Sequence, residues 1–187
     1  NGYIDDFYGY NFAYGYHVPL DDNGHGTHCA GIACAVTDNN IGVAGISWNC
    51  SVMALKIMNE SGFGGVHKSV EAITYAADNG ANVISMSYGH EGSPHPAETD
   101  AVIYAYSNNV VLTGASGNGG EDGICDPECN YPGGYDEVIT VGSSSRFDQK
   151  TTSSNYGDCL DVLAPGHVIL STYWENDEHT YEKQGGT

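Results

Sequence analysis

Residues 21–31 read DDNGHGTHCAG and place two histidines, His25 and His28, three positions apart between small residues. Two kinds of chemistry use such a pair: metal binding by both rings, or proton transfer by one ring that its neighbours hold in place. Zinc is disfavoured, because this pair supplies at most two ligands and the metalloprotease helix H-E-x-x-H is absent. On this stretch alone, a structural role for two core histidines remains the alternative to proton transfer.

Two apolar segments of the chain run into small, polar, glycine-rich ends. Residues 82–87 (NVISMS) continue into YGH, and residues 110–116 (VVLTGAS) continue into GNGG. In open parallel sheets, ligands bind at the carboxyl ends of the strands. A site is therefore expected where Ser87, Gly89 and Asn118 meet, since an Asn amide on a rigid strand end can donate to developing negative charge.

The elements that position these residues alternate between strands and helices. Strands are predicted at 51–58, 82–87, 110–116, 137–143 and 160–166, and helices at 27–36, 66–80 and 98–109. In the helix 66–80, Val66, Val70, Ile73 and Ala77 share one face, and Gly80 is a stop signal at its end. Strands that alternate with helices of this length indicate an α/β fold, with a parallel sheet covered on both faces.

Length and charge limit the possible partners. The 187 residues suit one domain with its own core, or most of a larger domain. A net charge of -19 argues strongly against nucleic acid as a partner, and no apolar run approaches the roughly 20 residues of a membrane helix. The charge is interpreted as a source of solubility, with acidic loops that hold calcium as the functional alternative.

The cysteines do not form the paired C-x-x-C clusters of a zinc ribbon; they are Cys29, Cys34, Cys50, Cys125, Cys129 and Cys159. The CDPEC loop allows a short disulfide between Cys125 and Cys129. With 14 Tyr and few Lys, the composition is typical of an exported, secreted protein. Since the first residue is Asn1 rather than Met, the chain is expected to be a fragment or a processed product.

The chain resembles the subtilisin-like serine peptidases, the subtilase family, over nearly its whole length. NGHGTHCAG resembles the family's histidine motif, NVISMSYG its substrate-binding strand, VVLTGASGN its oxyanion-hole strand and TDNNIGVAGI its calcium-binding loop. YPGGYDEVITVGS and LDVLAPG resemble the strands that follow the specificity pocket. The resemblance implies a three-layer subtilisin-like fold, with a mostly parallel twisted sheet and helices on both faces, of which residues 1–187 form an incomplete part.

The resemblance implies a serine endopeptidase that cleaves protein or peptide substrates through an acyl-enzyme. His25 would be the general base, His28 a supporting residue, and Asn118 the amide donor of the oxyanion hole. The substrate would pair as an added strand with Ser87, Tyr88 and Gly89 on one side and Gly62, Phe63 and Gly64 on the other. The side chain on the acyl side of the scissile bond (P1) would lie between Ala115, Gly117 and the loop around Asn130.

The resemblance also implies accessory features. A structural calcium ion would be held by Thr37, Asn39, Ile41 and Val43, through a side-chain oxygen of Asn39 and backbone carbonyl groups of the others. The Tyr131–Pro132 bond is expected to be cis and to shape the specificity pocket. Acidic residues are predicted to rim the P1 site and to disfavour cleavage after Asp or Glu; they are Glu121, Asp122, Asp126 and Glu128. A pro-region is expected in the full-length precursor.

The sequence departs from the family's pattern at both ends. The serine motif G-T-S-M-A stops after GGT, so the nucleophile is expected directly after Thr187, and a D-[ST]-G turn carrying the acid is expected before Asn1. Asp5 and Asp6 are weaker candidates for the acid, because their context resembles an acidic loop of the calcium-binding type. The chain alone is therefore expected to be inactive, and its full-length parent active. A non-catalytic pseudo-peptidase with a structural or binding role is the alternative.

Overall fold

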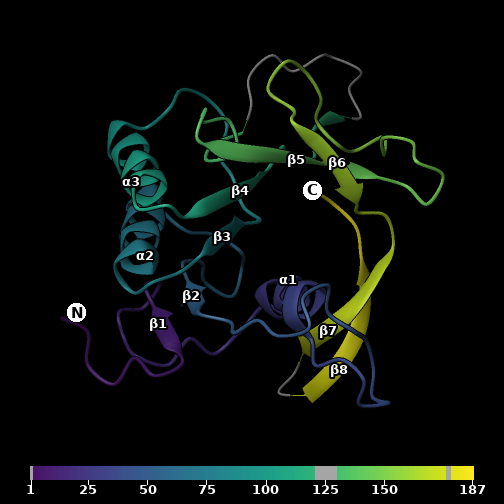
Figure 1. The fold of residues 1–187 in the computed structure, drawn as a ribbon, viewed down its shortest axis with the longest axis horizontal. Coiled ribbons are helices and arrows are strands. Elements are labelled where there is room, and N and C mark those ends of the chain that lie inside the picture. Colours follow the sequence, from purple (N-terminus) through teal and green to yellow (C-terminus); the bar gives the residue numbers. More distant parts are fainter. Residues whose placement is uncertain (1, 121–129, 176–177) are drawn as a thin grey trace. The chain divides into compact units, whose positions relative to one another are not determined.

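The computed structural model describes residues 2–120, 130–175 and 178–187 (Figure 1). The chain divides into two compact units. The first unit comprises Asn1–Ala72 and Leu170–Lys183, and the second comprises Ile73–Ile169 and Gln184–Thr187. Within the described residues, no helix combines the length and the apolar character needed to cross a membrane. The C-terminal segment thus contributes residues to both units.

The second unit is built on a four-stranded parallel sheet. Its strands, in spatial order, are β3 (Val83–Met86), β4 (Val111–Ala115), β5 (Val138–Ser144) and β6 (Val162–Pro165). Helix α3 (Pro96–Ser107) connects β3 to β4 and packs against β4. The four strands and this helix overlap the predicted segments, and the parallel α/β character that the sequence predicted is confirmed.

The core of the second unit lies on one face of this sheet. Met86 and Leu112 are each 1% exposed, and Val102 of α3 is 0% exposed. The side chains of Val83, three positions before Met86, and of Val111, one position before Leu112, are 58% and 47% exposed. Because successive side chains of a strand point to opposite faces, the apolar runs of these strands supply both a buried face and an exposed one.

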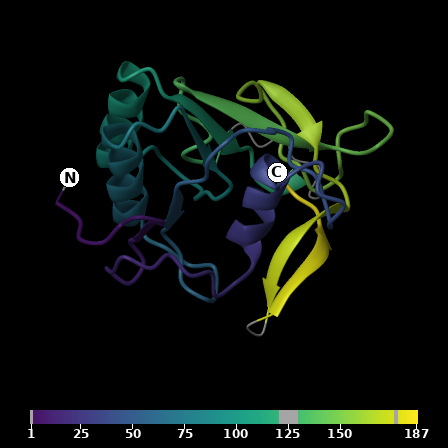
Figure 2. The ribbon, with the colours of Figure 1, turned by 60° about the horizontal axis from the view of Figure 1, so that its bottom comes forward.

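The first unit holds the histidine motif. Its elements are β1 (Gly9–Asn11), α1 (His25–Cys34), β2 (Ala54–Lys56), β7 (Ile169–Glu175) and β8 (Glu178–Gln184). β1 pairs with β2 in parallel, and β7 pairs with β8, the yellow strands of Figure 2. Helix α2 (Val66–Asp78) begins in the first unit and ends in the second. β1, β7 and β8 were not predicted from the sequence.

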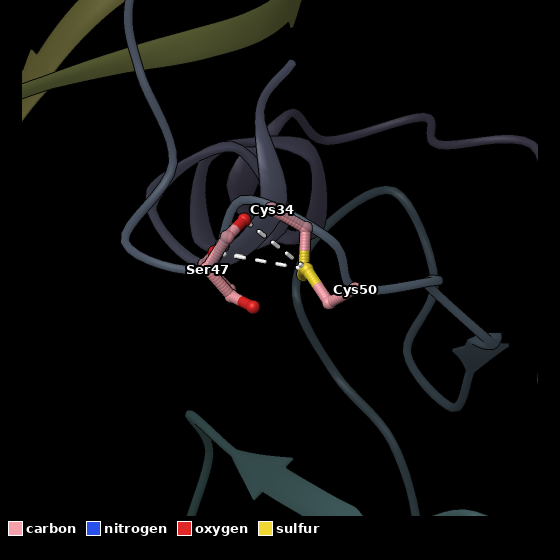
Figure 3. The surroundings of a disulfide bond; sticks show 4 residues. Cys34, Ser47 and Cys50 are labelled. Carbon is pink, nitrogen blue, oxygen red and sulfur yellow. Dashed lines mark hydrogen bonds between the residues drawn. A yellow bond between two sulfur atoms is a disulfide. The ribbon is translucent and has the colours of Figure 1, made fainter. Parts of the chain in front are cut away.

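A disulfide joins the end of α1 to the loop that precedes β2. Cys34 and Cys50 are bonded, with their Cα atoms 5.9 Å apart (Figure 3). The carbonyl oxygen of Ser47 lies 3.6 Å from Sγ of Cys50 and packs against the bond. Cys159 is also disulfide-bonded. The predicted bond between Cys125 and Cys129 lies outside the described residues.

Replacing both Cys34 and Cys50 by Ser in the full-length protein is expected to lower the free energy of unfolding by about 3 kcal/mol. The bond closes a loop between residues 16 apart in sequence, and its loss restores conformational entropy to the unfolded chain. Urea unfolding measures the change. Either single Cys→Ser variant should show the same loss of stability, because each breaks the same bond. A double variant that unfolds at the wild-type midpoint would contradict this account.

Candidate active site

His25 is the first residue of α1 and its side chain is exposed. Its Nε2 lies 3.7 Å from Sγ of Cys29, one helical turn further along, and Cys29 carries a thiol. The hydrogen bond with Cys29 raises the pKa of His25 above its ordinary value; partial burial opposes the shift, and electrostatic interactions with Cys29 and Asp21 add to it. The ring is therefore accessible and rests on a helix that fixes its position, as a proton-transferring group requires.

Asp21 holds the start of this helix. Its Oδ1 accepts hydrogen bonds from the backbone N–H groups of Asn23 and Gly24, both at 2.9 Å. Its Oδ2 accepts from the N–H of Thr27 at 2.9 Å and from Oγ1 of Thr27 at 2.6 Å. Burial pushes the pKa of Asp21 upward, but these hydrogen bonds outweigh it and hold the pKa below its ordinary value. The ionised carboxylate thus satisfies N–H groups at the positive end of α1, directly beside His25.

Asp21→Ala is expected to destabilise the full-length protein by about 1 kcal/mol at neutral pH, the usual cost of losing a side-chain cap. Because the folded-state pKa is depressed, the stabilisation is complete above the unfolded value of 3.8 and is lost as the pH falls through the folded value. Urea unfolding at pH 7 and pH 3 measures both effects, with the exposed helical Asp100→Ala as control. A destabilisation that stays equal at the two pH values would refute the carboxylate's role.

His28, in contrast, is 4% exposed and is built into the first unit. Its Nε2 lies 3.2 Å from the carbonyl oxygen of Glu182 in β8, a distance at which the ring N–H donates. Its own carbonyl oxygen accepts a hydrogen bond from Oγ of Ser171 in β7 at 2.8 Å. Among the described residues, no group of three or more His, Cys, Asp or Glu side chains could hold a metal ion. The two histidines therefore differ: His28 anchors α1, while the ring of His25 stays accessible.

Two glycines allow α1 to lie close to β7. A Cβ on Gly24, which has φ +92°, would come within 2.5 Å of the ring of Tyr173. A Cβ on Gly31 would overlap the side chains of Ser171 and Thr172. Oγ1 of Thr172 donates to the carbonyl oxygen of Thr27 at 2.9 Å. The glycines of the motif thus make room for a strand that binds the helix through hydroxyl groups.

Asn118 lies in the second unit, just beyond β4, and is exposed. Its Oδ1 accepts a hydrogen bond from the N–H of Thr187 at 3.1 Å, and Oγ1 of Thr187 lies 3.4 Å away. A backbone N–H can only donate, so this contact fixes which side-chain atom of Asn118 is the oxygen. The N–H of Gly117 donates to Oγ1 of Thr187 at 3.1 Å. The Asn118 amide group is therefore oriented, with its Oδ1 directed toward Thr187.

Asn155 supports this turn and was not anticipated from the sequence. It is 6% exposed; its Oδ1 accepts from the N–H of Gly119 at 2.6 Å, and its Nδ2 donates to the carbonyl oxygen of Ser116 at 3.0 Å. Its backbone N–H donates to the carbonyl oxygen of Gly117 at 2.9 Å. One buried amide side chain therefore fixes the loop on both sides of Asn118.

The predicted substrate-binding residues of the second unit lie together. Ser87 and Tyr88 are half-buried and Gly89 is exposed, directly after β3. A Cβ on Gly89 would lie 3.1 Å from Cβ of Asn130, and a Cβ on Gly117 would overlap the Asn130 side chain. The three segments that carry Gly89, Gly117 and Asn130 therefore converge.

The segment after Asn130 lies against the end of β4. The Tyr131–Pro132 bond is cis, as predicted. A Cβ on Gly133 would come within 2.5 Å of the carbonyl oxygen of Ala115 at the end of β4. Ala115 therefore lies against the same segment as its predicted partner Asn130. The acidic rim predicted for Glu121, Asp122, Asp126 and Glu128 lies outside the described residues.

Gly62, Phe63 and Gly64 form an exposed turn of the first unit, where Phe63 is 75% exposed. Oδ1 of Asn59 accepts hydrogen bonds from the N–H groups of Ser61 and Phe63, both at 3.0 Å. The backbone of Asn59 also pairs with Phe63 and Gly62, at 2.9 Å in each case. This turn is thus ordered by one side chain, while the backbone beyond Phe63 remains accessible.

The predicted calcium ligands lie in the loop after α1; they are Thr37, Asn39, Ile41 and Val43. They alternate with three residues in left-handed backbone conformations: Asp38, Asn40 and Gly42, with φ of 57°, 57° and 59°. Oδ1 of Asn39 accepts from the N–H of Ile41 at 3.0 Å. Among the described residues, no hydrogen bond uses the carbonyl oxygens of Thr37, Ile41 or Val43. These oxygens fit the ligand chemistry of calcium, a hard cation.

Comparison with known proteins agrees with this geometry. The family model of the subtilases, Peptidase S8, matches residues 1–187. Thermitase from Thermoactinomyces vulgaris is 41% identical over 179 residues, which are 96% of this chain and 61% of thermitase. Subtilisin DY from Bacillus licheniformis is 40% identical over 179 residues, 96% of this chain and 63% of that protein.

Solved structures give the same result. A protease from Pseudoalteromonas arctica PAMC 21717 matches with a TM-score of 0.80 and 31% identity, covering 88% of this chain and 55% of that one. The prenylagaramide maturation protease PagA matches with a TM-score of 0.78 and 29% identity, covering 88% and 58%. The chain thus spans somewhat more than half the length of these relatives. It belongs to the subtilase family.

Proposed function

We propose that the full-length protein is a secreted serine endopeptidase that hydrolyses peptide bonds of protein or peptide substrates through an acyl-enzyme. The observation that carries this proposal is the contact of Asn118 with Thr187, where the N–H of Thr187 donates to Oδ1 at 3.1 Å. Thr187 ends the GGT segment that, by resemblance, precedes the serine nucleophile. Because this contact uses Oδ1, it leaves the amide NH₂ of Asn118 to donate to an oxyanion formed beside the segment.

His25 has the properties of the general base in this reaction. It is exposed, and the helix that carries it is held by the Asp21 cap at one end and by His28 within the unit. A serine hydroxyl becomes an effective nucleophile only when a base within hydrogen-bond reach takes its proton. In this role His25 accepts the proton of the nucleophile and then returns it to the leaving amine.

Substrate recognition is assigned to backbone groups and small residues. The exposed backbone at Gly89 and at Gly64 would pair with an extended peptide. Ala115, Gly117 and Asn130 would contact the P1 side chain, since they lie together in the second unit. Export is supported by the disulfide between Cys34 and Cys50, because such bonds persist in oxidising compartments. A pro-region in the precursor is part of the same proposal.

A fluorophosphonate probe, which reacts with activated serine hydroxyls, tests the proposal on the full-length protein. Labelling of one serine, located by mass spectrometry, together with hydrolysis of an unlabelled protein substrate is the expected result. His25→Ala should abolish both signals, because the hydroxyl then has no base. A wild-type protein that folds, takes no label and hydrolyses nothing would overturn the peptidase and leave a binding or structural domain.

We also propose a structural calcium ion at residues 37–43, and expect chelation to lower the thermal midpoint of the full-length protein. A ligand that binds only the folded state at 100 times its Kd stabilises it by about 2.7 kcal/mol. Asn39→Ala should lower the midpoint in calcium and should reduce the further effect of the chelator, because it removes the side-chain ligand. A midpoint that is the same with and without chelator would show that no stabilising ion is bound.

A further inference from the structure

Helix α3 carries a carboxylate in the core of the second unit. Glu98 is 0% exposed. Its Oε2 accepts hydrogen bonds from Nε2 of His90 at 3.1 Å and from Oη of Tyr135 at 3.2 Å. Its Oε1 is buried and has no hydrogen-bond partner among the described residues. Because burying a carboxylate costs free energy, an apolar residue would suit this core better, and the two groups that Glu98 holds account for its presence.

The first of these groups, His90, joins the proposed substrate-binding strand to the proposed P1 site. His90 follows Gly89 directly, and its backbone pairs with that of Tyr131, which follows Asn130. The two N···O distances of this bridge are 2.8 Å and 2.9 Å. The bridge therefore joins the segment of Gly89 to the segment of Asn130. Glu98 holds the ring of His90, whose backbone forms this bridge.

The second group, Tyr135, contacts the other residue of this bridge, Tyr131. Tyr135 is 7% exposed, and its ring contacts the ring of Tyr131 with centroids 4.7 Å apart. Its hydroxyl accepts a hydrogen bond from the backbone N–H of His95 at 3.2 Å while it donates to Glu98. One carboxylate thus holds His90 directly and holds Tyr131 through the ring of Tyr135.

We propose that Glu98 is a specificity-determining positioning residue, which through His90 and Tyr135 fixes the Asn130 segment against the segment of Gly89 and so the shape of the P1 site. The inference rests on the proposed peptidase function, because it takes the Gly89 segment as the strand that pairs with the substrate backbone and the Asn130 segment as a wall that contacts the P1 side chain. Glu98 itself is buried and does not touch substrate. Loss of the carboxylate frees the bridge, and the P1 site then discriminates less well between small and large P1 side chains.

Three variants of the full-length protein separate this role from a general effect on folding. Glu98→Leu removes the hydrogen-bond acceptor and fills its place in the core with an apolar side chain of similar size. Tyr135→Phe removes only the hydroxyl group. Glu98→Gln keeps one oxygen that can accept from both partners, and is the conservative variant. Glu71→Gln is the matched control, because the Glu71 carboxylate is 46% exposed and pairs with Lys68 on the surface.

The measurement is a competition between two peptides that differ only at P1, with Ala in one and Phe in the other. The ratio of their kcat/KM values does not depend on the fraction of enzyme that is folded, so a purely structural loss leaves it unchanged. Glu98→Leu is expected to change this ratio about tenfold, which is within the range of selectivity changes that pocket shape produces. Tyr135→Phe should change it in the same direction by about threefold, while Glu98→Gln and Glu71→Gln stay close to wild type.

An unchanged ratio in Glu98→Leu, in an enzyme that otherwise cleaves both peptides, overturns the positioning role. If that variant yields no folded protein, Tyr135→Phe decides in the same way, since it removes a single oxygen from the network. A folded wild-type protein that cleaves neither peptide overturns the peptidase function itself, and this role with it. The two failures are therefore distinguished by the wild-type reaction alone.

Discussion

In the full-length protein, His25→Ala is expected to abolish peptide hydrolysis within the limits of detection. Without its base, the nucleophile retains its proton, and only binding and the oxyanion hole remain, worth roughly 10³–10⁴ over the reaction in water. The loss should appear in kcat, because the ring takes part in bond making rather than in holding the ground-state substrate. Single-turnover rates with a peptide ester and a protein substrate measure it.

The matched control is His67→Ala, which removes an exposed imidazole from α2. It should leave kcat unchanged, and circular dichroism of both variants should match the wild type, since neither ring is buried. If the His25→Ala variant retained a tenth of the wild-type kcat, a general base at this position would be ruled out. Proton transfer would then have to be assigned to another group.

The strands of the second unit could be predicted because their hydrophobic pattern is simple. β3 to β6 are short apolar runs bounded by glycine and polar residues, which is the pattern of a buried parallel sheet. β7 could not be found in the same way, because its pattern is inverted. Leu170 is 46% exposed, while Ser171 is fully buried and donates to the backbone of α1. Because Ser171 and Thr172 bind the helix through hydroxyl groups, the buried positions of this strand are polar and do not follow the apolar pattern of β3 to β6.

The candidate reactive residues of the site could be named from the sequence, but the residues that hold them in place could not. His25 and Asn118 lie in local motifs, and their residue types indicate the expected chemistry, proton transfer by an imidazole and hydrogen-bond donation by an amide. Asn155 reaches Ser116 across 39 positions, and Glu98 reaches Tyr135 across 37, so only the fold reveals these contacts. Asp21 gave a local signal, an acidic residue just before a helix, but the helix was expected to begin at Thr27 rather than at His25.

Asn118→Ala is expected to lower kcat of the full-length protein by roughly 10²–10³, with a much smaller change in KM. The amide NH₂ donates to negative charge that develops only in the transition state, so its loss affects the reaction more than the binding of substrate. The matched control is Asn108→Ala, which removes an exposed amide at the end of α3. It should change neither constant.

Asn118→Asp separates catalysis from support of the chain at Thr187. An aspartate keeps an oxygen that accepts from the N–H of Thr187, so the contact at 3.1 Å persists. Its second oxygen, however, replaces the NH₂ donors by a negative charge that repels an oxyanion. If Asn118 acts by electrostatic stabilisation, the Asp variant must lose at least as much kcat as the Ala variant. If it acted only by holding Thr187, the Asp variant would retain near wild-type activity, and the oxyanion role would have to be abandoned.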